Sequence, residues 1–173
     1  MLKKHRQEAP EQVSVAVVTV SDTRNKETDK SGKRIMDLLQ SVGYTISFYE
    51  IIPDEKDRIE KTIKQATAQK NVQAVIMNGG TGISKRDVSI ETIEPMFTKE
   101  LSGFGELFRY LSYELDIGSA SILSRATAGV INDRIVFAVP GSSGAVKLAM
   151  EKLILPEIGH IVRELEKDLN GNE

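Results

Sequence analysis

The residues Val13-Ser14-Val15-Ala16-Val17-Val18-Thr19-Val20 are apolar at almost every position and rich in β-branched side chains. Such a run predicts a strand that is covered on both faces, as the strands of parallel sheets are. Similar runs follow at residues 44–52 and 72–77. We therefore expect three strands, and the segments between them decide how these strands are connected.

Both connecting segments carry a helical pattern. The first is apolar at helical spacing as far as Gly43, a residue type that favours the end of a helix. The second follows Pro53 and places Ile59, Ile63 and Ala66 on one side. Strands that alternate with helices predict right-handed crossovers, and hence an α/β fold with a parallel sheet and helices on both faces.

The second half of the chain is less regular. An apolar stripe predicts a helix near residues 104–115. We expect short strands that make the sheet mixed, at residues 121–124, 129–131 and 134–139. Asn132-Asp133 can form a hairpin turn between the last two. A helical pattern runs from Ser143 to the end of the chain, and Pro156 is expected to kink or divide that helix.

Length and composition are those of an ordinary globular domain. The chain has 173 residues, of which 40% are hydrophobic and 28% charged, and its formal net charge is −2. We expect one domain over residues 13–169, preceded by a flexible arm at residues 1–12. The near-neutral charge argues against nucleic acid or an anionic membrane as a partner, and no apolar run is long enough to span a bilayer.

Two residue types exclude much of the usual hydrolytic chemistry. The chain has no cysteine, which excludes thiolate ligands and a cysteine nucleophile and suits a reducing cytoplasm, where we expect the protein to work. His5 falls in the expected arm and His160 in the terminal helix, so neither is well placed for acid–base catalysis. What remains is chemistry that depends on positioning, a metal ion and charge neutralisation, as in transfer between phosphates.

A glycine loop follows the strand at residues 72–77 directly, with the sequence Asn78-Gly79-Gly80-Thr81-Gly82. Its glycines let the backbone reach positive φ and bring N–H groups close to an anion. The structural alternative is a tight turn that binds nothing. The loop is neither a Walker A loop nor the dinucleotide fingerprint. It is followed by Lys85, Arg86 and Asp87, which a simple turn does not need.

Two carboxylates are expected at the carboxyl edge of the sheet, where open α/β sheets bind their ligands. Asp54 follows the strand at residues 44–52, and Asp87 follows the glycine loop. Two carboxylates that hold Mg²⁺ against phosphate oxygens are a common arrangement. The structural alternative is that each caps a helix, Asp54 with Asp57 as its capping-box partner and Asp87 at a helix that begins near Val88.

Three further corners carry polar or small residues. Pro140-Gly141-Ser142-Ser143 either offers N–H groups to an anion or caps the last helix. Ser124-Arg125 either presents a planar fork to a phosphate or is a solvated surface arginine. Ser21-Asp22-Thr23-Arg24 is polar, but taken alone the sequence assigns it no role.

Six motifs occur along the chain in a fixed order: Thr19-Val20-Ser21-Asp22; Ile52-Pro53-Asp54-Glu55; the glycine loop with Lys85-Arg86-Asp87-Val88; Ser102-Gly103-Phe104-Gly105-Glu106; Ser124-Arg125-Ala126; and Val139-Pro140-Gly141-Ser142. Together they resemble the molybdopterin-binding family, which includes the B proteins of molybdenum cofactor biosynthesis and the molybdopterin adenylyltransferases. The resemblance extends from about Val13 to the final helix. It implies a three-layer α/β/α sandwich with a mostly parallel, mixed sheet.

The resemblance also implies an activity. The terminal phosphate of molybdopterin would attack the α-phosphate of ATP, with Mg²⁺ as cofactor. Asp54 and Asp87 would be the catalytic carboxylates and the metal ligands. The residues implied to bind the pterin phosphate or the nucleotide are Ser21, Asp22, Gly79, Gly80, Thr81, Gly82, Lys85, Arg86, Ser124, Arg125, Pro140, Gly141, Ser142 and Ser143. The implied partners are copies of the same chain, as a trimer or as a hexamer of two trimers, and other proteins of the pathway.

Two positions depart from the family pattern. Asn78 stands where Thr is usual, and Lys85 replaces the first arginine of a pair, which keeps the charge but loses a planar fork. Some relatives of the B branch have lost the catalytic aspartates, whereas both are present here, which favours an active enzyme. The alternatives are a non-catalytic molybdopterin carrier or scaffold, and a nucleotide-pyrophosphate hydrolase on the same fold.

Overall fold

The computed structural model describes residues 12–167 and 169, so the arm expected at residues 1–12 lies outside the described residues except for its last position. Within this part of the chain six strands form one sheet in the order β2-β1-β3-β6-β5-β4. The parallel strands are β1 (Ser14–Val20), β2 (Thr45–Ile52), β3 (Ala74–Asn78) and β6 (Arg134–Val139). β5 (Thr127–Ile131) runs antiparallel to β6, and β4 (Lys99–Glu100) antiparallel to β5.

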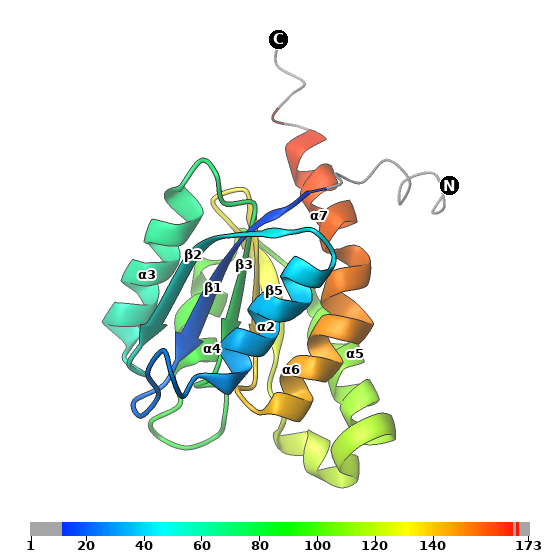
Figure 1. Ribbon diagram of the computed structural model, residues 1–173. Helices are drawn as coiled ribbons and strands as arrows, with labels where there is room; N and C mark the ends of the chain where they lie inside the picture. Colours follow the sequence, from blue (N-terminus) through cyan, green and yellow to red (C-terminus); the bar gives the residue numbers. More distant parts are fainter. Residues whose placement is uncertain (1–11, 168, 170–173) are drawn as a thin grey trace.

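Helices cover both faces of the sheet, as Figure 1 shows. One face carries α2 (Lys30–Ser41), α5 (Ser102–Ser112), α6 (Ser143–Ala149) and α7 (Leu155–Lys167), and the other carries α3 (Lys56–Ala68) and α4 (Ser89–Ile93). Alternation along β1 explains the two layers, because Val15 and Val17 pack with the first group whereas Ala16 and Val18 pack with the second. The expected three-layer α/β/α fold with a mixed sheet is confirmed.

Short irregular helices complete the chain. Residues Glu94–Met96 and Gly118–Leu123 form 3₁₀ helices, while Tyr113–Ile117 and Met150–Ile154 form π-turns. The second π-turn lies directly before Pro156, which has no N–H to continue the α-helical bonding. The expected division of the terminal helix near Pro156 is therefore confirmed.

Several local predictions also hold. Gly43 has a φ of +84° after α2, as expected of a glycine that ends a helix. Asn132 and Asp133 have φ of +50° and +59° between β5 and β6, which confirms the hairpin turn.

One predicted strand is wrong, and one observed strand was missed. Residues 121–124 belong to the 3₁₀ segment, where the Ser124 N–H donates to the Ser121 carbonyl at 2.9 Å, and Ile122 is 83% exposed. The apolar side chains of Ile122 and Leu123 are exposed, so this short apolar run forms a 3₁₀ turn and not a strand. The missed strand, β4, consists of two exposed charged residues and carries no apolar pattern to reveal it.

The register of the parallel strands brings the carboxyl ends of three strands to one edge of the sheet. Thr19 lies opposite Asn78, and Asn78 lies opposite Val139, so β1, β3 and β6 end in one row. The corners that follow these strands therefore lie side by side at the lower edge of the sheet in Figure 1. No helix among the described residues combines the length and the apolar character needed to cross a membrane.

Candidate functional site

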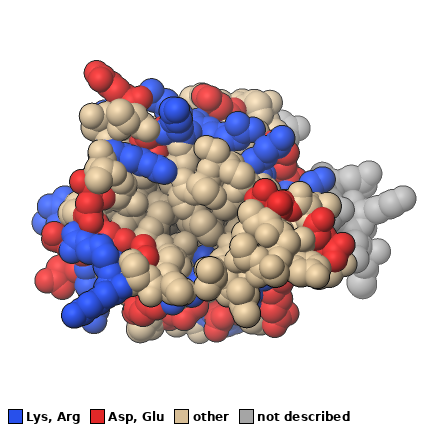
Figure 2. Space-filling view, turned by 90° about the horizontal axis from the view of Figure 1, so that it is seen from below, with Lys and Arg blue, Asp and Glu red and all other residues tan. Residues whose placement is uncertain are grey.

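A pocket of about 450 Å³ opens at the carboxyl ends of β1, β3 and β6. Most of the predicted binding residues line it, and these are Ser21, Gly79, Gly80, Thr81, Gly82, Asp87, Ser124, Arg125, Pro140 and Gly141. Figure 2 looks onto this face and shows a hollowed, mostly uncharged centre with charged side chains around it. The topology thus brings together corners that lie far apart in the sequence.

The glycine loop lines this pocket and has free backbone donors. Gly79 and Gly80 have φ of +97° and +65°, so both need glycine. The N–H of Gly79 donates to the Val139 carbonyl at 3.0 Å. Within residues 12–167 and 169, the N–H groups of Gly80, Thr81 and Gly82 find no protein acceptor. Three adjacent unpaired N–H groups form a suitable cradle for an anion.

Asp54 lies behind this loop and does not cap a helix. The N-cap of α3 is Glu55, without a side-chain capping bond, so the structural alternative for Asp54 is wrong. Asp54 instead accepts a hydrogen bond from the Val88 N–H at 3.3 Å. A Cβ atom at Gly80 would lie 2.6 Å from Asp54 Oδ2, so the carboxylate packs directly against the loop.

Asp87 does not cap a helix either. The N-cap of α4 is Val88, which makes no side-chain capping bond, whereas the Asp87 carboxylate accepts from the Ser84 N–H at 3.0 Å. A Cβ atom at Gly82 would lie 2.5 Å from Asp87 Oδ2. Asp54 and Asp87 therefore lie against the first and second halves of the same loop, and Asp87 faces the pocket.

The charge of Asp87 acts on Asp54. Burial raises the pKa of Asp54, the Val88 N–H partly opposes this, and the negative charges of Asp87 and Asp22 raise the pKa further. In the described part of the chain no three acidic or histidine side chains converge as a metal site. Two carboxylates still fit Mg²⁺, which commonly takes its remaining ligands from water and substrate phosphate.

Asp22 and Arg86 bind each other. The Arg86 Nε and Nη2 atoms donate to the two carboxylate oxygens of Asp22 at 2.8 and 2.9 Å. Arg86 thereby lowers the pKa of Asp22 to about 2, and Asp22 raises the pKa of Arg86. Asp22 Oδ1 also accepts from the Asp54 N–H at 3.1 Å. The pair joins the corner after β1 to the segment around Asp87, and neither residue lines the pocket.

Arg125 lines the pocket but is engaged with the protein. Its Nε donates to the Thr81 carbonyl at 2.8 Å and its Nη2 to the Gly82 carbonyl at 2.6 Å, while Nη1 pairs with Glu91. The bond to Glu91 raises the pKa of Arg125 and lowers that of Glu91. The guanidinium therefore ties the glycine loop to α4, which contradicts the alternative of a merely solvated arginine.

The remaining predicted residues lie at the margin. Ser142 accepts from the Ala145 N–H at 3.3 Å, so it caps α6 as the structural alternative expected. Ser142 and Ser143 are exposed and do not line the pocket. Lys85 lies with Asp54 and Arg86 in a neighbouring hollow.

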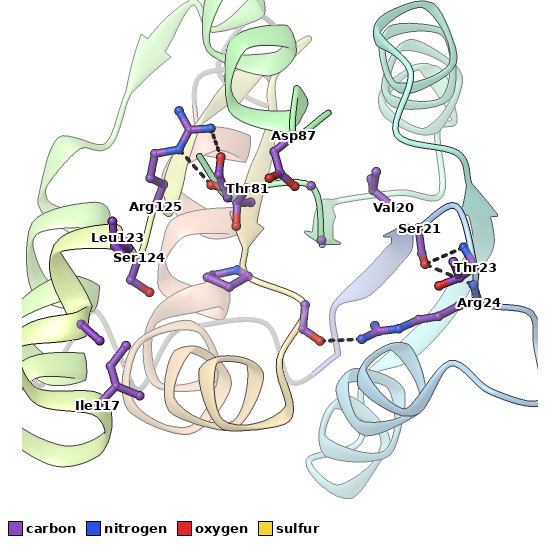
Figure 3. A pocket seen from close by; sticks show the side chains of 16 residues that line it. Val20, Ser21, Thr23, Arg24, Thr81, Asp87, Ile117, Leu123, Ser124 and Arg125 are labelled. Carbon is purple, nitrogen blue, oxygen red and sulfur yellow. Dashed lines mark hydrogen bonds between the residues drawn. The ribbon is translucent and has the colours of Figure 1, made fainter. Parts of the chain in front are cut away.

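Sequence reasoning missed part of the pocket wall. Arg24 lines it from the β1 corner, and Ile117 and Leu123 line it from the opposite side (Figure 3). The polar run of residues 21–24 was the available signal for Arg24. Nothing in the sequence indicated that the π-turn Tyr113–Ile117 and the 3₁₀ segment Gly118–Leu123 would bring apolar side chains to a ligand site.

Comparison with known proteins gives consistent matches. Residues 16–160 match the model of a family described as a probable molybdopterin binding domain. The chain is 58% identical over 167 residues to molybdenum cofactor biosynthesis protein B of Bacillus subtilis, a match that covers 96% of this chain and 98% of that protein.

Solved structures agree with these sequence matches. A crystal structure of molybdenum cofactor biosynthesis protein B is 51% identical, with a TM-score of 0.90 over 92% of this chain and 99% of that one. The tungsten cofactor synthesizing protein MoaB from Pyrococcus furiosus is 44% identical, with a TM-score of 0.77 over 91% and 99%.

Proposed function

Because the chain belongs to the molybdopterin-binding domain family, we propose that it works in molybdenum cofactor biosynthesis, where it binds molybdopterin and adenylylates it with ATP. The family match covers most of the chain, and two relatives that are 58% and 51% identical carry names from this pathway. The adenylyl transfer itself is our inference from the site.

The proposed reaction needs no protein base. The terminal phosphate of molybdopterin attacks the α-phosphorus of ATP, a new P–O–P bond forms, and the bond to the β-phosphate breaks as pyrophosphate leaves. The second pKa of a phosphomonoester is about 6, so the attacking oxygen is already ionised at neutral pH. This agrees with a pocket whose lining residues include no histidine or cysteine.

Some residues of the site would bind the phosphate groups, and others would hold the metal ion that neutralises the charge of these groups. The free N–H groups of Gly80, Thr81 and Gly82 would bind phosphate oxygens. Asp54 and Asp87 would hold Mg²⁺, which supplies positive charge to the reacting phosphates. The Asp22–Arg86 pair would keep the two carboxylates in register without touching substrate.

One observation carries the proposal. Two carboxylates, Asp54 and Asp87, pack against a glycine loop that lines a pocket and carries three unpaired N–H groups. A purely structural turn does not need this combination. Neither carboxylate caps the helix beside it, so the most economical structural explanation of both residues is removed.

The test is direct. Purified protein with molybdopterin, ATP and Mg²⁺ should yield adenylylated molybdopterin and pyrophosphate, and Asp87→Asn should lose the product while keeping its fold. No product, under conditions in which a known family enzyme forms it, overturns the proposal. Tight pterin binding that is indifferent to Asp54→Ala and Asp87→Ala would favour a carrier. Hydrolysis of dinucleotides without pterin binding would favour the hydrolase.

We also propose that the protein is a homo-oligomer. Large apolar side chains are exposed on α5 and the two irregular helices that follow it, namely Leu107, Tyr110, Tyr113, Leu115, Ile117, Ile122 and Leu123. Soluble monomers rarely expose many large apolar groups together. The trimer or hexamer implied by the resemblance and the cytoplasmic location suggested by the absence of cysteine stay predictions.

A further inference from the structure

Arg24 is a positively charged residue in the wall of the pocket, and no sequence motif assigned it a role. It lines the pocket at the corner after β1, and its side chain is 32% exposed. Its Nη2 donates to the Gly141 carbonyl at 3.0 Å and its Nη1 to the Ser31 hydroxyl. Figure 3 shows the side chain reaching across to the Pro140-Gly141 turn. Arg24 thus connects the corners after β1 and β6 beside the glycine loop.

A fully buried carboxylate holds this guanidinium in place. Asp29 is 0% exposed, and its Oδ1 lies 3.6 Å from Arg24 Nη1. Burial alone would raise the pKa of Asp29, but hydrogen bonds from the Thr19 hydroxyl, the Gly32 N–H and the Tyr49 hydroxyl together bring it below its ordinary value. Asp29 is therefore ionised, and its negative charge is spread over these fixed donors.

The same network reaches the base of the glycine loop. The Ser31 hydroxyl that accepts from Arg24 donates to Asn78 Oδ1 at 2.8 Å, and Asn78 Nδ2 donates to Thr19 Oγ1 at 2.9 Å. Asn78 is the last residue of β3, directly before Gly79. Asn78 therefore links the glycine loop to the Asp29 network.

Arg24 retains donors for a ligand. Within the part of the chain that the structure describes, protein atoms accept hydrogen bonds from two of the five N–H groups of its guanidinium, and Arg24 lines the pocket. By contrast, all three nitrogens of Arg125 donate to protein. A guanidinium held from behind by a buried carboxylate is well suited to bind a phosphate, because little of its freedom is lost on binding.

We propose that Arg24 is a phosphate-binding residue of this pocket and that Asp29 is the positioning residue that orients it. The inference rests on the proposed function for its ligand, which is a phosphate group of either the nucleotide or the pterin. It adds a cation and a buried positioning group that the sequence motifs do not contain.

Isothermal titration with tripolyphosphate, ATP and a pterin phosphomonoester tests the proposal on the full chain. Arg24→Gln should weaken binding of at least one probe about tenfold or more, as expected for a lost charge-assisted hydrogen bond. Arg34→Gln on the exposed side of α2 loses the same charge and should bind as the wild type does. Loss confined to ATP and tripolyphosphate assigns Arg24 to the nucleotide, and loss confined to the pterin compound assigns it to the pterin phosphate.

A double-mutant cycle separates positioning from stability. Asp29→Asn should weaken binding in the wild type but should add nothing in the Arg24→Gln background. The double variant removes both charges, so it avoids leaving a buried charge unpaired and should keep its fold. An equal loss in both backgrounds would mean that Asp29 acts only through stability, and it would overturn the positioning role.

Two outcomes overturn the role of Arg24. One is unchanged affinity of Arg24→Gln for all three probes, and the other is no binding of any probe by the wild type. These results are separable from the proposed function. Adenylyl transfer with an unchanged KM in Arg24→Gln would refute this inference alone, whereas phosphate binding that depends on Arg24 without any adenylyl transfer would count against the proposed function alone.

Discussion

The carboxylate of Asp54 accepts a hydrogen bond from the backbone N–H of Val88, 34 residues further along the chain, at 3.3 Å. Asp22 accepts from the Asp54 N–H and binds Arg86, two residues before Val88. These contacts close a ring that sets the position of Asp54 relative to Asp87. The ion pair of the ring joins two exposed side chains, Asp22 and Arg86, and exposed ion pairs add little stability, so we infer that the ring serves to position Asp54.

The first prediction concerns Asp54, whose ionised form is disfavoured in the folded protein. Because folding raises its pKa, the charged side chain costs stability above the ordinary pKa of 3.8. Asn can keep the acceptor for Val88 and removes the charge. Asp54→Asn should therefore melt at an equal or higher temperature at pH 7, and this gain should disappear as the pH falls below 3.8. Adenylyl transfer should fall on the order of 100-fold or more.

Thermal melts at both pH values and a product assay check this prediction. Asp37→Asn on the exposed side of α2 serves as the matched control, with little effect on either measurement. A clear drop in the melting temperature of Asp54→Asn at pH 7 would show that the carboxylate is structural.

The second prediction concerns Arg86 and the pH profile. The positive charge of Arg86 lowers the pKa of Asp54, while Asp22 raises it. Arg86→Gln removes the first effect and leaves Asp22 unpaired, so both changes push the pKa of Asp54 upward. The acidic limb of the kcat/KM profile should therefore move to higher pH. Arg58→Gln, which breaks a distant exposed pair with Glu50, should leave the limb in place. An acidic limb that stays in place or moves to lower pH in Arg86→Gln would contradict this prediction.

The parallel half of the fold was predictable because its signals are local. Strands β1, β2 and β3 are largely apolar runs. Gly43 and Asn132-Asp133 mark turns, because these residue types tolerate positive φ. Residues 121–124 misled because a short apolar run fits a strand and a 3₁₀ turn equally well. A π-turn precedes this segment, and composition does not reveal it.

Site residues were predicted better than their roles. Topology alone places the corners after β1, β3 and β6 together, which is why most of the expected residues line one pocket. The roles depend on partners distant in sequence, such as Asp22 for Arg86 and Glu91 for Arg125. Arg24 was missed for the same reason, since its role is visible only beside the buried Asp29.

The third prediction concerns Gly80, where a side chain would displace Asp54. A Cβ atom there would lie 2.4 Å from Ser89 Oγ and 2.6 Å from Asp54 Oδ2, and the φ of +65° is unfavourable for alanine. Gly80→Ala should cost about 2–4 kcal/mol of unfolding free energy and abolish activity. Gly43→Ala is the matched control, because its φ is +84° but nothing lies within 4 Å of the added atom. It should cost about 1–2 kcal/mol and keep activity.

Urea unfolding and the product assay measure both variants. The difference in stability between them isolates the contact from the backbone strain. Equal losses of stability, or an active Gly80→Ala, would show that the loop can move without disturbing Asp54.

The last prediction concerns the exposed apolar side chains of α5 and of the two irregular helices that follow it. These three helices pack against one another. Phe104 and Phe108 of the same stripe are buried, whereas Leu107 and Leu115 are 53% and 60% exposed, so only part of the stripe packs within the chain.

Sedimentation velocity at micromolar concentration should show a trimer or hexamer. Ile122→Asp should shift it to smaller species without lowering the stability of the chain itself, because Ile122 is 83% exposed. Val42→Asp, on the C-cap of α2 and 48% exposed, should leave the assembly intact. A wild-type monomer, or an assembly that tolerates Ile122→Asp and Leu107→Asp together, would mean that this surface is not the contact between copies.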